Sequence, residues 1–332
     1  MRNILCVTLI ALLGGCTSTS VTEKYQDKRN DIINVKDKVI EFETGNVLIG
    51  SVSRLYMSNK CLLIADHKSV DKQIHIFNKN DFSYLTSIGN FGEGPEEITV
   101  MGCLAIDEAH HQLYVSDHAK QKIFSYDMDS VMVDSLYKPQ VKTAMNETLF
   151  PSEYQYINDT LSIAVLIKPT STSTFNQFLG RWNMNTGEMI PMKYTHPDIQ
   201  KKRITFAASE KAVIYVEGYT RHDLMTICSL DGELLYNIYG PDWDGGNGNK
   251  LQSFGTVMIG NDKIFVSYCG EDYARDSFPT KILVFDLEGN YLKTLETGYK
   301  ISDCCYDSFN NRIILSLNDV VQFAYLDIDG II

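Results

Sequence analysis

The sequence has a deficit of basic residues and lacks the short motifs that identify common enzyme classes. Lys and Arg number 30 against 42 Asp and Glu, which gives a formal net charge of -12. This balance argues against a nucleic-acid partner, because a polyanion requires clustered basic side chains that displace its counterions. The chain contains no G-x-S-x-G, Walker A, H-E-x-x-H or dinucleotide-binding motif. The sequence therefore predicts no catalytic residue and no cofactor.

The sequence also lacks helical periodicity. No segment carries apolar residues at helical spacing over about a dozen positions, which argues against crossover helices and an α/β fold. Tyr and Phe are plentiful, with 19 and 15 residues, as expected of pleated, half-buried strands. With 332 residues and 44% hydrophobic composition, the chain can bury one large core or two medium ones. These features favour an all-β protein.

The cysteines that follow residue 16 do not have the spacing of a metal-binding knuckle. Four of them lie inside apolar strand patterns and are interpreted as small buried hydrophobes: Cys61, Cys103, Cys228 and Cys305. An oxidising compartment would permit a disulfide between Cys269 and Cys304. The sequence leaves that pairing open.

The first residues form a predicted targeting segment. Arg2 is followed by an apolar run over residues 4–13, which is too short to cross a bilayer as a permanent helix. The run ends in Leu13-Gly14-Gly15-Cys16, which resembles a bacterial lipobox. In a lipobox, cleavage before the cysteine leaves it carrying several acyl chains, enough for stable membrane anchoring. We therefore predict a signal peptide over residues 1–15 and a lipid anchor at Cys16.

Residues 16–37 are polar, of mixed charge and poor in large apolar side chains, so they predict a flexible tether. Thr17, directly after the lipidated cysteine, resembles lipoproteins that are sent on to an outer membrane. The expected location is therefore the cell envelope, at the outer membrane.

A repeat of about 40 to 50 residues organises the rest of the chain. Each unit contains short strands joined by turn residues such as Asp231-Gly232, and strand patterns of this kind predict antiparallel meanders. The second unit is expected to end in a strand over residues 133–137. The last unit has only three strands, whereas an unpaired strand over residues 38–43 precedes the first unit. Together they complete one four-stranded blade.

We therefore predict a six-bladed β-propeller over residues 38–332, closed by its N-terminal strand, which removes an exposed sheet edge. A seventh blade would need about forty more residues. A β-sandwich explains neither the repeat nor the missing strand.

Two motifs support a resemblance to a known family. The connector I-G-x-x-G-E-G-P-E-E-I at residues 88–98 resembles that of six-bladed, TolB-like propellers, which occur as lipoproteins in Bacteroides-type bacteria. The strand pair LYVSD and KIFSYD within residues 113–127 is similar to NHL repeats. The resemblance implies the propeller fold and the envelope compartment, and it supplies no catalytic residue.

The meander order sorts the loops onto two faces of the disc. Loops between the second and third strands share one face with the blade-to-blade connectors, and the remaining short turns share the other. The first, here called the loop-rich face, carries the long segments 89–98, 168–177, 194–203, 218–223, 240–253 and 269–279. Long loops on a rigid scaffold usually carry binding. The candidate binding residues on this face are Asp66, His67, Glu93, Glu96, Asp117, His118, Arg221, His222, Trp243, Tyr273 and Arg275.

Several of these residues have two interpretations. The Asp66-His67 and Asp117-His118 pairs occupy equivalent positions in neighbouring blades. They are either metal ligands or acid-base groups around the channel, or turn-forming aspartates that are each followed by an exposed histidine. Glu93 and Glu96 point into the channel or face water. The acidic, glycine-rich loop around Trp243 resembles a calcium loop, although Trp243 packing on a neighbouring blade is favoured.

The predicted function is a lipid-anchored binding module of the cell envelope that contacts a protein or a glycan through the loop-rich face. The alternative is a metal-dependent propeller enzyme, similar to lactonases or lyases, with ligands around the channel. The sequence assigns no metal ligand.

Overall fold

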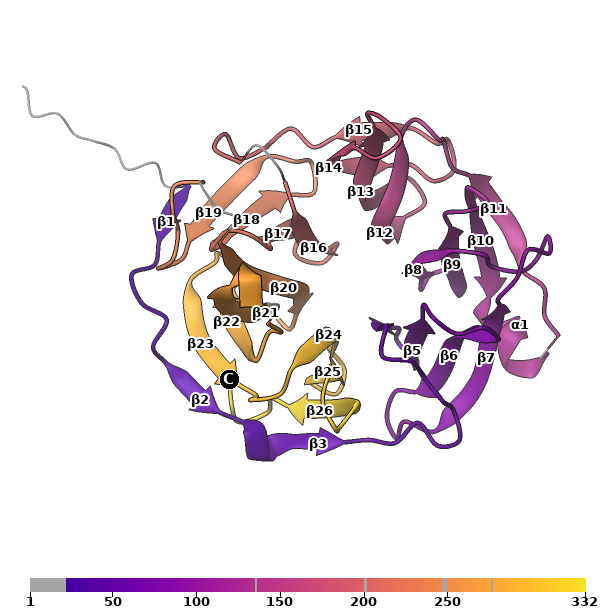
Figure 1. Ribbon diagram of the computed structural model, residues 1–332, viewed down its shortest axis with the longest axis horizontal. Coiled ribbons are helices and arrows are strands. Elements are labelled where there is room, and N and C mark those ends of the chain that lie inside the picture. The colour runs from indigo at the N-terminus through magenta and orange to yellow at the C-terminus, as the bar shows by residue number, and fades with distance from the viewer. Residues whose placement is uncertain (1–21, 135, 200–201, 247–249, 276) are drawn as a thin grey trace, which may run out of the picture.

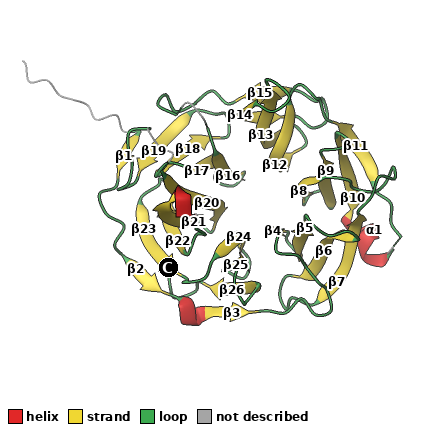
Figure 2. Cartoon of the chain, in the orientation of Figure 1, coloured by secondary structure: helices red, strands yellow, loops and turns green. Residues whose placement is uncertain are grey.

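The computed structural model describes residues 22–134, 136–199, 202–246, 250–275 and 277–332. It contains six β-sheets arranged in a ring (Figure 1), which confirms the predicted six-bladed propeller. Strands dominate the structure (Figure 2), and helical segments are short: η1 (Lys36–Lys38), α1 (Met128–Val133) and η2 (Tyr273–Arg275). No described helix has the length and apolar character needed to cross a membrane. The predicted signal peptide and Cys16 lie outside the described residues.

Each blade is an antiparallel meander whose first strand lies nearest the centre of the ring (Figure 1). Blade one contains β4 (Ser53–Met57), β5 (Cys61–Asp66), β6 (Lys72–Asn78) and β7 (Tyr84–Asn90). Blade two contains β8 (Met101–Asp107), β9 (Gln112–Asp117), β10 (Lys122–Asp127) and β11 (Gln140–Ala144). Blade three contains β12 (Phe150–Asn158), β13 (Leu161–Pro169), β14 (Phe175–Trp182) and β15 (Met189–Pro191).

Each of the other three blades combines a strand from the N-terminal segment with strands from the second half of the chain. Blade four contains β16 (Ile204–Ser209), β17 (Ile214–Tyr219), β18 (Leu224–Ser229) and β19 (Leu234–Tyr239), with β1 (Glu23–Tyr25) added. Blade five contains β20 (Leu251–Gly260), β21 (Lys263–Asp272), β22 (Lys281–Asp286) and β23 (Tyr291–Glu296), with β2 (Ile32–Asn34) added. Blade six contains β24 (Ile301–Asp307), β25 (Arg312–Leu317), β26 (Phe323–Asp327) and β3 (Val39–Glu41).

The ring closes as the sequence predicts. Strand β3 pairs antiparallel with β26, with Ile40 opposite Tyr325, so the N-terminal strand becomes the fourth strand of blade six. This pairing covers the β26 edge that the C-terminal strands alone would leave open.

The segment before β3 differs from the prediction. Strand β1 pairs parallel with β19 and β2 pairs parallel with β23, so residues 22–37 run around the outside of blades four to six (Figure 1). Arg29 enters the protein between β1 and β2 and forms a buried ion pair with Asp223, at 2.7 Å. The prediction of a flexible tether is therefore wrong for residues 22–37, here called the N-terminal strap.

Blade two also departs from the prediction at residues 133–137. Residues 128–133 form α1, whose first turn is capped by the Asp127 side chain, which accepts a hydrogen bond from the Ser130 backbone N–H at 2.7 Å. The fourth strand of the blade, β11, follows only at Gln140.

The core is divided among the blade junctions. Within the described residues, six clusters of buried hydrophobic side chains each join two neighbouring blades. The second strands carry much of this packing, and β5, β17 and β25 are buried at every position. Because this packing at the blade junctions holds the blades together, the initial residues of the first strands can present polar side chains to the centre of the ring.

Candidate functional site

The connector at residues 88–98 is a structural joint. Glu97 accepts a hydrogen bond from the Gly94 backbone N–H at 2.8 Å, and the Lys120 ammonium donates to the carbonyl oxygens of Gly94 and Glu97, both at 2.5 Å. A Cβ at Gly92 would lie 2.0 Å from the Glu97 carboxylate, so a larger residue there would displace the Glu97 side chain from its hydrogen bond to Gly94. The motif fixes the passage from blade one to blade two.

The other two acids of the connector do not reach the channel. Glu93 is exposed, and Glu96 forms a surface ion pair with Lys138 at 2.7 Å. The interpretation in which Glu93 and Glu96 point into the channel is therefore wrong.

Asp66 and Asp117 are turn-forming residues. Asp66 accepts backbone N–H bonds from Gly50 and Lys68, at 2.7 and 3.0 Å. Asp117 accepts them from the backbone N–H groups of Thr99, Val100, Ala119 and Lys120. These buried carboxylates join blades one and two to the connectors that precede them, and each of their oxygens already accepts at least one backbone hydrogen bond.

The two histidines that follow these aspartates are half-buried, not exposed as the turn interpretation expected. Burial lowers the pKa of both His67 and His118. The Nδ1 atom of His67 lies 3.3 Å from the Met101 carbonyl oxygen, and the His118 ring packs edge-on against Phe150. Neither histidine lines a cavity at the centre of the ring.

Three other predicted residues are occupied by local contacts. Trp243 packs against His196, His222 and Tyr239, on the outer part of its own blade four. His222 is buried beside it, and burial lowers its pKa. Arg275 forms an exposed ion pair with Glu271 at 2.9 Å. Trp243 and His222 thus pack together on blade four, and Arg275 is paired on a loop of blade five.

Arg221 and Tyr273 do come together. They lie on the β17–β18 and β21–β22 loops, and the Arg221 guanidinium carbon is 3.1 Å from the centroid of the Tyr273 ring. The tyrosine is 46% exposed, so this stacked pair is open to solvent on the loop-rich face.

The pair forms one wall of a cavity of about 550 Å³ at the centre of the loop-rich face, here called the mouth. The mouth is built by residues in the first part of β4, β16, β20 and β24, by Gln177 of β14 in blade three, and by the loops of blades four and five. Its polar lining includes Arg54, Gln177, Arg203, Arg221, Gln252, Thr256, Tyr273 and Asp303. Side chains from five of the six blades therefore converge at this point.

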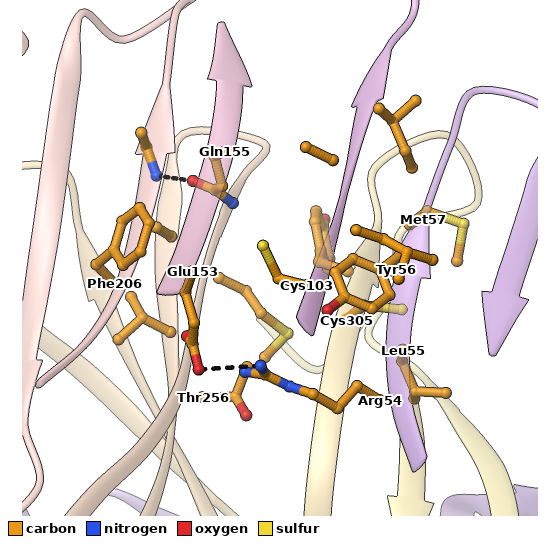
Figure 3. Close-up of a pocket in the computed structure, with 18 of the residues that line it drawn as sticks. Arg54, Leu55, Tyr56, Met57, Cys103, Glu153, Gln155, Phe206, Thr256 and Cys305 are labelled. Carbon is orange, nitrogen blue, oxygen red and sulfur yellow. Dashed lines mark hydrogen bonds and ion pairs between the residues drawn. The ribbon is translucent and has the colours of Figure 1, made fainter. Parts of the chain in front are cut away.

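Below the mouth lies a second cavity of about 370 Å³, the channel, which all six first strands line (Figure 3). Arg54 and Glu153 reach toward each other across it, from β4 and β12, and form an ion pair at 3.0 Å. Deeper in the channel the lining becomes less polar, with Tyr56, Cys103 and Phe206. The charged groups are thus concentrated toward the mouth.

Asp303 is the buried acid of the mouth. Its two carboxylate oxygens accept hydrogen bonds from the Leu55 backbone N–H at 2.8 Å and from the Thr256 hydroxyl at 2.7 Å. Burial raises the pKa of this carboxyl group. The side chain therefore joins blades five, six and one, and both of its oxygens are already engaged.

The cysteines of the described residues are free and buried, including Cys269 and Cys304, so no disulfide joins these two. Burial raises the pKa of the Cys103 thiol to about 12. The prediction of buried cysteines is confirmed.

One group of three side chains among the described residues has the geometry to hold a metal ion: Asp107, His110 and Asp159. It lies on the face of short turns, away from the mouth. Asp107 already accepts hydrogen bonds there from the His110 ring and the Tyr114 hydroxyl, at 2.9 and 3.1 Å.

Sequence reasoning found Arg221 and Tyr273 but missed Arg54, Arg203 and Asp303. The missed residues share a position at or just before the start of a first strand. A signal for them exists, because the initial residues of the first strands lie at the central opening and on the loop-rich face.

Comparison with known proteins identifies the fold family. The family model DUF5128, described as a 6-bladed beta-propeller, matches residues 17–217, more than half of the chain. No curated protein matches the chain.

Solved structures share the fold at low sequence identity. A Bacteroides fragilis protein assigned as exported is 14% identical, with a TM-score of 0.57, over 89% of this chain and 87% of that one. A DUF4221 family member from Bacteroides vulgatus is 12% identical, with a TM-score of 0.54, over 90% and 98%. The Cps50 (Swd1) propeller domain of Myceliophteria thermophila is 10% identical, with a TM-score of 0.55, over 87% and 99%.

Proposed function

Since this chain belongs to the DUF5128 family of six-bladed beta-propellers, we propose that it is a lipid-anchored binding module of the cell envelope. Its ligand, a protein or a glycan, occupies the mouth. The propeller fold hosts many unrelated functions, so the proposal depends on the site. One observation carries it, namely that polar side chains from five blades converge on a single cavity of about 550 Å³. Cavities of this size with a few convergent polar groups are typical of binding sites.

The envelope location is supported by the lipobox at residues 13–16 and by the Bacteroides fragilis structural neighbour, which is assigned as exported. The finer resemblance to TolB-like propellers and NHL repeats is part of the same proposal. It depends on the connector at residues 88–98 and on the strand pair of blade two.

The mouth is tested with an alanine variant and a matched control. Arg221→Ala is expected to abolish the recovery of a partner from detergent-solubilised envelopes, because it removes the most accessible stacked cation of the mouth. Arg275→Ala removes an arginine of the same loop as Tyr273 whose side chain does not line the mouth and is paired with Glu271, so it should recover the partner as the wild type does. Equal recovery by all three proteins, or no recovery by the wild type, would contradict the proposal.

The anchor is tested separately. Cys16→Ala is expected to move the protein from the membrane fraction to the soluble fraction, because no thiol remains to carry the acyl chains. Cys6→Ala changes a cysteine within the signal segment and should leave the mature protein on the membrane. Centrifugal fractionation followed by immunoblotting measures both, and a Cys16→Ala protein that still sediments with membranes would rule out the anchor.

A further inference from the structure

The mouth has the opposite charge to the molecule. The chain as a whole carries a formal charge of -12, whereas the ionisable side chains that line the mouth include three arginines, Arg54, Arg203 and Arg221, and one aspartate, Asp303. A positively charged patch at the centre of an acidic surface attracts anions to that patch and not to the rest of the protein.

The arginines are not all neutralised by neighbours. Arg54 is paired with Glu153 at 3.0 Å. Among the described residues, Arg203 and Arg221 form no ion pair, and the Arg221 guanidinium stacks on the Tyr273 ring. The Asp303 oxygens are already occupied by the Leu55 N–H and the Thr256 hydroxyl. Two guanidinium groups at the mouth are thus available to a ligand, and guanidinium recognises carboxylate through paired hydrogen bonds.

The rest of the accessible lining is mostly polar. Gln177 and Gln252 present carboxamides, and Tyr273 presents an aromatic face and a hydroxyl. Most apolar residues at the mouth, such as Ile204, Phe254 and Ile301, are buried in the blade junctions, and Phe278 is half buried. A lining of amides, hydroxyls and two aromatic side chains, Tyr273 and Phe278, fits the hydroxyl groups and the ring face of a sugar. A protein partner, in contrast, would need about 800 Å² of its own surface buried against a larger, flatter area.

We propose that the mouth binds a carboxylate-bearing sugar of an acidic glycan, with Arg203 and Arg221 holding the carboxylate and Tyr273 contacting the sugar ring. This inference rests on the proposed function and names its ligand class. Gln177 and Gln252 then form hydrogen bonds with the neighbouring hydroxyl groups of the sugar.

The test uses a panel of oligouronates, made of galacturonate, glucuronate or mannuronate, and the methyl ester of each. Calorimetric titration should show binding of at least one oligouronate to the wild type and none of its methyl ester, since esterification neutralises the carboxylate and caps one of its oxygens with a methyl group, while the sugar ring and its hydroxyl groups stay unchanged. Binding should weaken as salt is raised, because the partners are exposed charges. Arg221→Ala should weaken it by about tenfold or more, as expected for the loss of a hydrogen bond to a charged group.

Two controls keep the result specific. Arg221→Lys retains the charge but loses the paired geometry and should bind between the wild type and Arg221→Ala. Arg275→Ala should bind as the wild type does, and thermal unfolding of each variant checks that the ring is intact.

The failure of every oligouronate, or equal binding of acid and methyl ester, would overturn the ligand class. If poly-glutamate binds instead and Arg221→Ala abolishes that binding, the glycan inference is wrong while the mouth stays a binding site. If neither polymer binds and the envelope recovery is also independent of Arg221, the proposed function fails as well.

Discussion

Arg29→Ala is expected to lower the free energy of unfolding by about 3 to 5 kcal/mol. The Arg29 and Asp223 side chains are only 6% and 0% exposed, and their 2.7 Å ion pair fastens the N-terminal strap to blade four. Removing the cation leaves the Asp223 carboxylate buried without its partner, and that uncompensated charge is the main cost. Urea and thermal unfolding measure the change.

The same variant should release the strap before the ring unfolds. Strands β1 and β2 contain three residues each, so the buried arginine between them holds much of the segment in place. Limited proteolysis should therefore cut Arg29→Ala within residues 22–34 faster than the wild type.

Arg275→Ala provides the comparison, because its pair with Glu271 is exposed and should contribute less than about 0.5 kcal/mol. If the two variants unfold alike, the buried pair does not stabilise the ring.

The architecture was largely predictable because each blade of a propeller repeats the same local pattern of strands and turns. The alternation of apolar residues and turns marks each meander, and the unpaired strand at residues 38–43 matched the strand missing from blade six. The strap was not predictable in the same way. Its strands are short, Tyr25 and Ile32 remain exposed, and a polar composition gives no sign that Arg29 is buried. The strap is held by pairing with the outer edges of blades that lie some two hundred residues away in sequence.

The site was only half predictable for a related reason. Arg221 and Tyr273 lie on long loops, which sequence reasoning searches first. Arg54, Arg203 and Asp303 lie at the starts of strands that are far apart in sequence, and only closure of the ring brings them together. The Asp-His pairs looked alike because each of their aspartates fastens a blade to its connector.

Asp307→Asn is expected to lower the free energy of unfolding by about 3 kcal/mol. Asp307 lies at the junction where the ring closes, and it accepts the Lys79 ammonium of blade one at 3.1 Å and the Arg312 guanidinium at 3.3 Å. Asparagine has nearly the same shape, but it leaves Lys79, only 7% exposed, without its counter-charge. Urea unfolding at neutral pH measures the loss.

Asp107→Asn is the matched variant, since Asp107 occupies the equivalent turn of blade two and accepts bonds from His110 and Tyr114 without a buried lysine. Asp107→Asn is expected to lower the free energy of unfolding by about 1 kcal/mol. Equal losses in the two variants would mean that the turn hydrogen bonds carry the stability and the buried cation does not.

The effect of Asp307→Asn should also depend on pH. Burial alone would raise the pKa of Asp307, but hydrogen bonds from Asn310 and Lys79 outweigh burial and lower the pKa below its usual value. A lowered pKa in the folded state means that the stabilisation is complete above about pH 4 and is lost as the pH falls through the folded-state pKa. The deficit of Asp307→Asn relative to the wild type should therefore shrink as unfolding is measured from about pH 5 down to pH 2. A deficit that stays constant over this range would show that the ionised carboxylate does not hold the last blade to the first.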